Sequence, residues 1–456
     1  MLAKEGNKVL KKGEVLQLKV EDLAFGGMGI SKWEGKVVFV KGGLPGDLVE
    51  AQINKVKSGY SEAQMVKLLQ PSSHRIPPSC PHFGVCGGCK LQDLDYRAQL
   101  SFKERHVGDN LQRIGGFPDP PLRKIIGADK IYFYRNKMEF TFSTLDEEPI
   151  LGLHKSGSFN QVFDLKRCLL QSELSNRILF QVREFVRQKG LSVYDLKRHK
   201  GLLRFLTIRE GKLSGEVMVS VVTSEEKFLQ MSELAQLLAK KFPHIVSIFQ
   251  IINPWRASVA LGEARLIWGE PKITEKIGEY DFSISPNSFF QTNPYQAERL
   301  YRLVRDLSRL EGIETIFDLY AGTGSIGIFL AKSARKVIGI ESQEGAVIDA
   351  RRNAESNGME NCQFIQGEVK DLLAQIKKIP NLAVVDPPRA GMHPKAIRAL
   401  LKVSPPRIIY VSCNPSALAR DLDLICEGGY KLKEVHPLDM FPHTYHIESV
   451  ALIEKG

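Results

Sequence analysis

A cysteine near the C-terminus has the setting of a nucleophile. Cys413 lies in the run Val-Ser-Cys-Asn-Pro and follows RIIYVS, a run of residues that predicts a strand. A thiolate at the end of a strand is exposed to ligands, and it attacks electrophilic carbon when its pKa is lowered or a base lies nearby. A buried core cysteine is the alternative interpretation, because most single cysteines pack in the interior.

Two acidic residues stand in comparable positions. Asp386 ends the apolar run LAVVD and is followed by two prolines and Arg389. Glu448 begins the apolar run ESVALIE close to the C-terminus. An acid at the start of such a strand is either a charge at the edge of a sheet or a buried general base, and both interpretations stay open for Glu448.

A glycine-rich loop supplies a candidate ligand site. Residues 318–327 read DLYAGTGSIG, follow a predicted strand and precede a predicted helix. Glycines such as Gly322 permit a tight turn and let the backbone approach a ligand. Glu341 ends the next predicted strand, where a carboxylate accepts hydrogen bonds from ribose hydroxyls. The pattern predicts an adenosyl ligand, either NAD or S-adenosylmethionine; a bare tight turn is the alternative.

The elements that must position these residues alternate between strand and helix over residues 286–456. The predicted strands include TIFDLY, KVIGIE, LAVVDPP and RIIYVSC. This alternation predicts an α/β doubly wound domain with a mainly parallel sheet, and the runs YKLKEVHPLDM and ESVALIE predict a closing antiparallel hairpin. Because ligands bind such sheets at the carboxyl ends of the strands, one rim should gather Tyr320, Glu341, Asp386 and Cys413.

The rest of the chain divides into two further predicted domains. Short β-rich runs separated by glycine and proline predict a small β-barrel over residues 1–70. The joint PSSHRIPPSCP follows, and residues 71–285 alternate strand-like and helix-like runs that predict a central α+β domain. Within it, we expect the helical part at 93–126 to pack on the α/β domain at 286–456.

Composition and charge limit the class of protein. The chain has 456 residues, of which 43% are hydrophobic and 25% charged, and this balance is typical of globular proteins. It contains neither an apolar run long enough to span a membrane nor a secretory signal, so we expect a cytoplasmic protein, and we expect a monomer. The formal net charge of +11 fits a nucleic-acid partner.

Seven cysteines are too few for a disulfide scaffold, so clustered cysteines indicate a metal site or catalysis. Three of them lie close together, at Cys80, Cys86 and Cys89. Thiolates bind either iron–sulfur clusters or zinc, and the single C-x2-C pair favours iron–sulfur only weakly. Unliganded thiols are the alternative.

Four motifs, in this order along the chain, resemble those of the RNA uracil-C5 methyltransferases: DLYAGTGSIG, DPPRAG, VSCNP and the H-x-E-S-V tail. Residues 289–293, FFQTN, resemble that family's glutamine motif, and residues 1–70 resemble an RNA-binding TRAM domain. With its cysteine cluster, the chain is most similar to the branch that methylates uridine in 23S ribosomal RNA. The resemblance covers nearly the whole chain, and transfer RNA stays the alternative substrate.

The resemblance implies a covalent route to a methylated uracil. Cys413 would add to C6 of the base, C5 would attack the methyl group of S-adenosylmethionine, and Glu448 would remove the C5 proton before Cys413 is released. The resemblance and the glycine loop together assign cofactor binding to Gln291, Tyr320, Gly322, Glu341 and Asp386. The aromatic pair Phe289-Phe290 is either core or a stacking surface.

The resemblance also implies a 4Fe–4S cluster held by Cys80, Cys86, Cys89 and Cys168. Methyl transfer needs no electrons, so the expected role of the cluster is structural or in positioning RNA. An unpaired uridine in a loop is the expected target, because a base costs least to extrude when it is unpaired. A non-catalytic RNA-binding iron–sulfur protein and a nicotinamide oxidoreductase are competing hypotheses. In the run YRNK, Arg135 and Lys137 predict an RNA surface or, alternatively, a solvated face.

Overall fold

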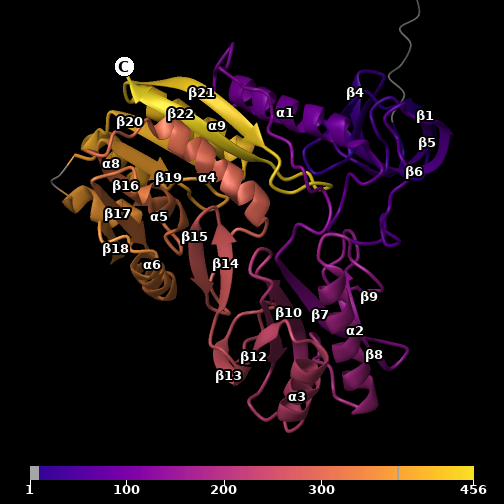
Figure 1. Cartoon of the computed structure of the whole chain (residues 1–456). Coiled ribbons are helices and arrows are strands. Elements are labelled where there is room, and N and C mark those ends of the chain that lie inside the picture. The colour runs from indigo at the N-terminus through magenta and orange to yellow at the C-terminus, as the bar shows by residue number, and fades with distance from the viewer. Residues whose placement is uncertain (1–9, 377–378) are drawn as a thin grey trace, which may run out of the picture. The chain divides into compact units, whose positions relative to one another are not determined.

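The computed structural model describes residues 10–376 and 379–456 (Figure 1). The chain divides into two compact units. The first unit contains the residues up to His106 together with His443–Tyr445, and the second contains Val107–Pro442 and His446–Gly456. No helix within the described ranges is long and apolar enough to cross a bilayer.

The first unit is built on a six-stranded sheet with the strand order β1-β5-β6-β4-β3-β2. Its strands are β1 (Val15–Lys19), β2 (Asp22–Leu23), β3 (Gly29–Trp33), β4 (Lys36–Lys41), β5 (Leu48–Val56) and β6 (Tyr60–Gln70). In β5, Val49, Ala51 and Ile53 are buried and alternate with polar residues, as expected for a strand with one face on a core. Because β1 also lies against β3, the sheet curls into the predicted small barrel.

An arginine fixes the loop that follows the barrel. The guanidinium of Arg75 lies 2.6 Å from Asp47 of the barrel and 2.7 Å from Asp93 at the far end of the loop. All three side chains are largely buried, so these ion pairs are weakly screened by solvent. The helix α1 (Tyr96–Arg113) follows, and its residues Val107 and Leu111 pack in a core shared with the C-terminal α/β part of the chain, for example with Tyr410.

The central part of the second unit is a seven-stranded sheet with the order β13-β12-β11-β10-β7-β8-β9. Its strands are β7 (Lys137–Leu145), β8 (Glu148–His154), β9 (Val162–Asp164), β10 (Leu203–Glu210), β11 (Val217–Thr223), β12 (Ile245–Ile252) and β13 (Glu263–Gly269). The helices α2 (Glu173–Gln188) and α3 (Met231–Lys241) pack against this sheet and each other. This is the predicted α+β arrangement. A hairpin of β14 (Ile273–Ile277) and β15 (Tyr280–Ile284) leads from it into the catalytic part.

The catalytic sheet has the order β18-β17-β16-β19-β20-β22-β21. Its strands are β16 (Thr315–Leu319), β17 (Lys336–Glu341), β18 (Cys362–Gln366), β19 (Leu382–Val385), β20 (Arg407–Ser412), β21 (Tyr430–Leu438) and β22 (Glu448–Lys455). The first five strands in the sheet order are parallel, and β22 and β21 close it antiparallel. The predicted doubly wound sheet and closing hairpin are therefore confirmed.

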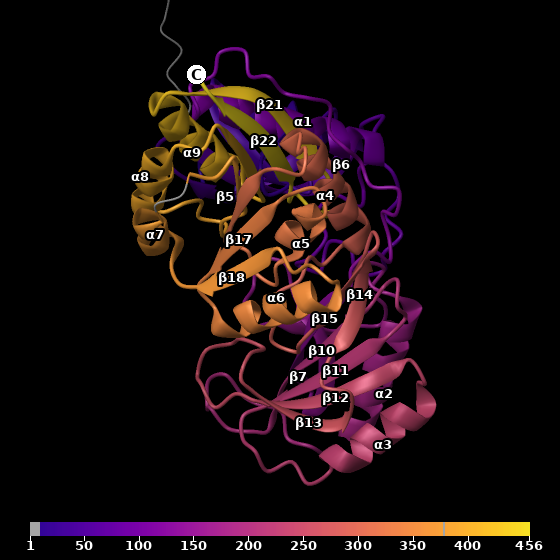
Figure 2. The ribbon, with the colours of Figure 1, turned by 60° about the vertical axis from the view of Figure 1, so that its left-hand side comes forward.

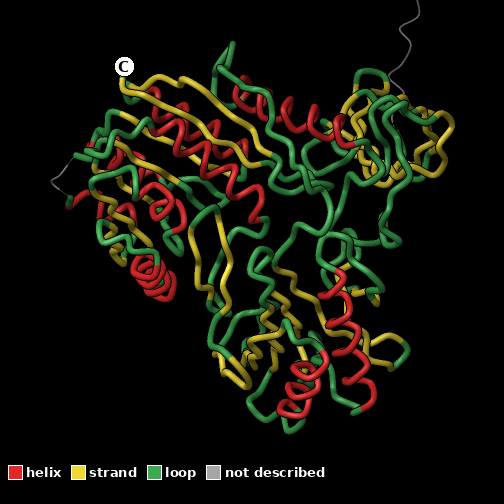
Figure 3. The backbone as a smooth tube through the Cα atoms, in the orientation of Figure 1, coloured by secondary structure: helices red, strands yellow, loops and turns green. Residues whose placement is uncertain are grey.

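Helices cover both faces of the catalytic sheet. On one face lie α4 (Pro294–Ser308), α5 (Ser325–Ala331) and α6 (Glu344–Ser356), and on the other α7 (Val369–Leu372), α8 (Pro394–Val403) and α9 (Pro415–Glu427) (Figure 2). The alternation of strands and helices here contrasts with the strand-rich first unit (Figure 3). The three-domain division at 1–70, 71–285 and 286–456 stays a prediction.

Candidate active site

The carboxyl ends of the parallel strands form one rim of the catalytic sheet. Leu319 at the end of β16 pairs with Ile340 of β17 and Val385 of β19. The strand β22 runs antiparallel to β20, with Ser449 opposite Ser412, so it begins where β20 ends. The residues that directly end, follow or begin these strands therefore share the rim: Tyr320, Glu341, Asp386, Cys413 and Glu448.

The glycine loop is held in a tight turn by Glu341. Tyr320, Gly322 and Gly324 have φ values of 63°, 55° and 79°, and Gly324 caps the start of α5. The backbone N–H of Gly322 donates to Oε2 of Glu341 at 3.0 Å, and that of Gln343 donates to its Oε1 at 2.8 Å. The carboxylate is thus fixed beside the loop and remains partly exposed, as a ligand for ribose hydroxyls would have to be.

A second acid below this loop was not predicted as a site residue. Asp318 is 1% exposed, and its Oδ2 accepts the backbone N–H of Gly327 at 3.0 Å. A Cβ atom at Gly327 would lie 2.8 Å from the same oxygen, so only glycine permits this approach. Burial raises the pKa of Asp318 to about 7, and Glu341 raises it further in the same direction. The signal in the sequence was an acid at the end of an apolar strand.

Cys413 lies between β20 and α9 and is partly buried, which differs from the fully buried core alternative. The next residue, Asn414, caps α9 by accepting the N–H of Ser416 at 3.1 Å, and its Nδ2 donates to the carbonyl of Arg389 at 2.9 Å. Burial raises the pKa of the Cys413 thiol to about 11, and Glu448 also raises it. Arg389, which hydrogen-bonds the sulfur, lowers it. The thiol therefore lies among groups that control its ionisation.

Burial shifts the pKa of both rim carboxyls, Glu448 and Asp386, upwards. Glu448 is 5% exposed, so it is not a charge at the sheet edge. Burial raises its pKa well above the ordinary value, and the neighbouring Asp386 raises it further. Burial together with Asp318 raises the pKa of Asp386 to about 7. Asp386 therefore exchanges a proton near neutral pH, and a carboxyl with a raised pKa is better suited to act as a general acid or base than an ordinary one.

The segment before α4 that carries Gln291 is held by residues that sequence reasoning missed. Asp349, 2% exposed on α6, accepts hydrogen bonds from the hydroxyls of Ser285 and Ser288. Nη2 of Arg209 donates to the carbonyl of Ser288 at 2.7 Å, and Nδ2 of Asn136 donates to that of Gln291 at 3.1 Å. The segment that carries Gln291 is therefore held in position both by residues of the central part and by Asp349 of α6.

The aromatic pair in this segment is divided between surface and core. Phe290 is 3% exposed, and its ring centroid lies 5.5 Å from that of Phe282. Phe289 is 69% exposed. The core interpretation is therefore correct for Phe290, and the exposed ring of Phe289 is open to a ligand.

The predicted iron–sulfur site is not shown. Cys80, Cys86 and Cys89 lie in the first unit and Cys168 in the second. The Cys86 sulfur accepts the N–H of Gly88 at 3.3 Å; burial raises its pKa, and Cys80 acts in the same direction. In residues 10–376 and 379–456 no three His, Cys, Asp or Glu side chains are grouped so that they could hold a metal ion. Thiolates have the right chemistry for a cluster.

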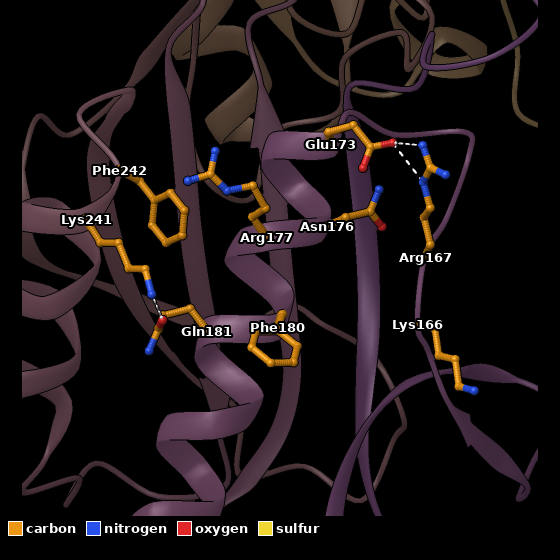
Figure 4. Close-up of a pocket in the computed structure, with 9 residues that line it drawn as sticks. All are labelled: Lys166, Arg167, Glu173, Asn176, Arg177, Phe180, Gln181, Lys241 and Phe242. Carbon is orange, nitrogen blue, oxygen red and sulfur yellow. Dashed lines mark hydrogen bonds and ion pairs between the residues drawn. The ribbon is translucent and has the colours of Figure 1, made fainter.

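The predicted basic surface near residue 135 is largely engaged by the protein itself. Lys137 lies 2.7 Å from Glu139, and burial lowers its pKa. Nε of Arg135 donates to the carbonyl of Lys137 at 3.0 Å. A separate surface pocket of about 310 Å³ lies over α2, away from the rim (Figure 4). It is lined by Lys166, Arg167, Glu173, Asn176, Arg177, Phe180, Gln181, Lys241 and Phe242.

Comparison with known proteins identifies the family of this chain. Residues 128–456 match the family described as tRNA (Uracil-5-)-methyltransferase. The chain belongs to this family. Residues 9–66 match the TRAM domain. The predicted family and the TRAM domain are therefore confirmed.

Relatives of the whole chain are methyltransferases as well. An RNA methyltransferase of Caldanaerobacter subterraneus is 41% identical over 451 residues, which cover 98% of this chain and 100% of the relative. One from Halalkalibacterium halodurans is 38% identical over 450 residues and covers 98% of each chain. The solved structure of the Pyrococcus abyssi tRNA (uracil-54, C5)-methyltransferase in complex with S-adenosyl-L-homocysteine has 32% identity and a TM-score of 0.78. The match covers 96% of this chain and 100% of that one.

This family membership decides between the two adenosyl ligands that the glycine loop left open. The methyl donor is S-adenosylmethionine, and the enzyme is an RNA (uracil-C5)-methyltransferase.

Proposed function

We propose that the enzyme methylates C5 of an unpaired uridine in 23S ribosomal RNA through a bond between Cys413 and C6 of the base. The observation that carries the covalent route is the position of Cys413 at the rim, where Glu448, Asp386 and Arg389 all act on its ionisation. A nucleophile, a proton acceptor and a cation within one site are the groups that such a route requires.

The covalent route makes a poor nucleophile reactive. The thiolate of Cys413 adds to C6, the C5–C6 double bond opens, and C5 gains the character of an enolate carbon. C5 attacks the methyl carbon of S-adenosylmethionine, the methyl–sulfur bond breaks, and S-adenosylhomocysteine is released. Glu448 then takes the C5 proton, and the double bond reforms as the bond between C6 and the Cys413 sulfur breaks. This step requires Glu448 in its ionised form, which Arg389 favours; once ionised, the buried carboxylate accepts the proton readily, because burial favours its neutral form.

The remaining predicted residues are assigned to the cofactor. Glu341 would accept hydrogen bonds from the ribose, and the turn at Gly322 would let the backbone approach the adenosyl group. Tyr320 and Asp386 lie at the ends of the adjacent strands β16 and β19, and Gln291 precedes α4. These assignments rest on the family resemblance and on the shared rim.

The test uses RNA that contains 5-fluorouridine. Fluorine at C5 cannot leave as a cation, so an adduct that has been methylated stays bonded to the protein. The wild-type enzyme should form a denaturant-resistant protein–RNA complex in the presence of S-adenosylmethionine. Cys413→Ala should form none, whereas Cys426→Ala, which removes another half-buried thiol on α9, should behave as wild type. An adduct of unchanged yield in Cys413→Ala would refute the covalent route.

Transfer RNA is the second candidate substrate, and one observation favours it. The Pyrococcus abyssi protein that matches 96% of this chain is a methyltransferase of uracil 54 in transfer RNA. The ribosomal proposal rests on the cysteine cluster, which resembles that of the ribosomal branch. Transfer of labelled methyl groups into unmodified 23S ribosomal RNA and into unmodified transfer RNA separates the two. Labelling of transfer RNA alone would overturn the ribosomal proposal and leave the chemistry intact.

The iron–sulfur cluster is proposed on the same resemblance and takes no part in the steps above. Iron and sulfide analysis of anaerobically purified protein, compared between wild type and Cys86→Ala, tests it. Anaerobically purified wild-type protein that contains no iron would contradict the proposal. The cytoplasmic location and the monomeric state stay predictions from the sequence.

A further inference from the structure

Five exposed side chains from two loops form a surface on the central domain that the methylation chemistry does not use. They are Lys197, Arg198, Lys200, Trp255 and Arg256, and together we name them the Trp255 surface. Trp255 is 54% exposed, an unusual degree for an indole. Within the described ranges none of the four cations lies within ion-pair distance of a carboxylate, in contrast to Lys137.

The first loop is a rigid turn that presents its cations outward. Asp195 Oδ1 accepts the backbone N–H groups of Lys197 and Arg198 at 2.7 and 3.0 Å. The N–H of Asp195 in turn donates to the carbonyl of Lys200 at 2.8 Å. The one carboxylate of the turn is thus directed at the backbone; Lys197 and Arg198 act on its charge from a distance but form no ion pair with it among the described residues, so both cations can contact a ligand.

The second loop is held by a buried arginine. Arg204 is 3% exposed at the start of β10, and its guanidinium donates to the carbonyls of Asn253, Trp255 and Ala257 at 2.7, 2.5 and 2.8 Å. The side chain of Asn253 also accepts the N–H of Trp255 at 2.9 Å. An exposed tryptophan on a loop fixed in this way loses little conformational entropy when it binds a ligand.

The same arginine joins the two loops. The Arg204 guanidinium carbon lies 4.4 Å from the ring centroid of Tyr194, and the backbone N–H of Tyr194 donates to the carbonyl of Leu203 at 2.8 Å. One buried cation therefore supports both the basic turn and the Trp255 loop and holds the two loops next to each other.

The Trp255 surface lies within reach of the active site. Arg209, five residues along β10 from Arg204, holds the Ser288 carbonyl in the segment before α4, and five strand residues span about 17 Å. On the other side, Nδ2 of Asn287 donates to the carbonyl of Gly262 at 2.9 Å, which ties the chain following the Trp255 loop to that segment. A few nucleotides of RNA span such a distance.

We infer that the Trp255 surface binds single-stranded RNA next to the target uridine, with an unpaired base stacked on the Trp255 indole and phosphates at the four cations. An exposed aromatic ring among unpaired cations is the combination by which proteins hold single strands. The inference rests on the activity on RNA. The α2 pocket is the competing basic surface, but there Arg167 pairs with Glu173 and Lys241 with Gln181 (Figure 4).

Two double variants test the inference, because each removes two exposed cations from the central domain. Lys197→Gln/Arg198→Gln changes the Trp255 surface, and Arg177→Gln/Lys241→Gln changes the α2 pocket. The affinity for unmodified substrate RNA is measured against salt concentration. The first pair should lower the slope of log K against log salt by about 1.4, at about 0.7 per phosphate contact. The second pair should leave slope and affinity at wild-type values.

The indole is tested separately. Trp255→Ala should weaken RNA binding roughly 5- to 150-fold, the range for loss of one stacked base, and Trp255→Phe should restore most of it. In kinetics the loss should fall on KM for RNA and not on KM for S-adenosylmethionine. Binding of S-adenosylhomocysteine by each variant verifies folding.

Wild-type RNA affinity in both Trp255→Ala and Lys197→Gln/Arg198→Gln would overturn the inference. An equal or larger loss in the α2 pair would also overturn it, because the RNA would then bind the α2 pocket. Failure of the covalent proposal is distinguishable, since it is read from the fluorouridine adduct of the wild-type enzyme and not from RNA affinity.

Discussion

Replacement of Arg389 by glutamine should reduce the reactivity of the Cys413 thiol. Burial and Glu448 hold the pKa of Cys413 at about 11, and Arg389 is the group that opposes them. At about pH 8 a thiol of this pKa is ionised to roughly one part in a thousand. Loss of an adjacent cation raises such a pKa by about one unit or more, so the thiolate population of Arg389→Gln should fall at least about tenfold.

The assay is alkylation of the protein by iodoacetamide over a range of pH, without RNA, followed by mass spectrometry of the Cys413 peptide. The alkylation rate follows the thiolate population, so the pH profile reports the pKa. Cys426 in the same molecule is an internal control, because burial and Asp423 raise its pKa and Arg389 does not act on it. Arg389→Lys, which keeps the charge, should show a smaller effect than Arg389→Gln.

A Cys413 profile in Arg389→Gln that coincides with that of wild type, or that moves to lower pH, would refute the reasoning. It would mean that the guanidinium does not stabilise the thiolate in the free enzyme. A parallel shift of Cys426 would show that the whole fold had changed and would equally contradict a local effect.

Two further predictions concern the glycine loop. Because burial raises the pKa of Asp318 to about 7, its protonated form stabilises the fold at low pH, and this contribution is lost as the pH rises from about 4 through about 7. As the pH rises over that range, wild type should lose up to about 4 kcal/mol of unfolding free energy that Asp318→Asn keeps. Denaturant titrations of both proteins at several pH values measure this difference. A difference between the two proteins that does not change with pH would contradict the prediction. Gly324→Ala places a Cβ atom 2.6 Å from Phe364, so it should lower the Tm and weaken S-adenosylmethionine binding, measured by calorimetry. Gly345→Ala, with open space around the added atom, should do neither, and equal losses in both variants would be evidence against the steric argument.

Local patterns predicted the residues that lie at strand ends. Cys413, Asp386 and Glu341 each follow or end a short apolar run, so the parallel sheet alone brings them to one rim. The same patterns left the role of Glu448 ambiguous, because an acid at the start of a strand has the same sequence pattern whether the strand lies at the edge of the sheet or in its interior. Only the position of β22 between β20 and β21 buries it.

Contacts between distant segments could not be predicted. Asn136 lies just before β7, Arg209 on β10 and Asp349 on α6, and all three contact one segment only because the central sheet and α6 both border the residues that carry Gln291. The spacing of apolar residues along the sequence reports local helices and strands and gives no information about such long-range contacts. Arg204 was missed for the same reason, because its role depends on a loop some fifty residues away that folds back over it.

The tail segment that belongs to the N-terminal unit has a consequence for how this enzyme could change in evolution. The carbonyl of His443 accepts the N–H groups of Lys90 and Leu91 at 2.9 and 3.1 Å, and Glu448 follows only five positions later. An ancestor could not have exchanged the barrel and its loop for an unrelated module without also refitting the strip of chain that leads to Glu448. The N-terminal barrel with its loop and the C-terminal strip around His443 should therefore have changed together during evolution.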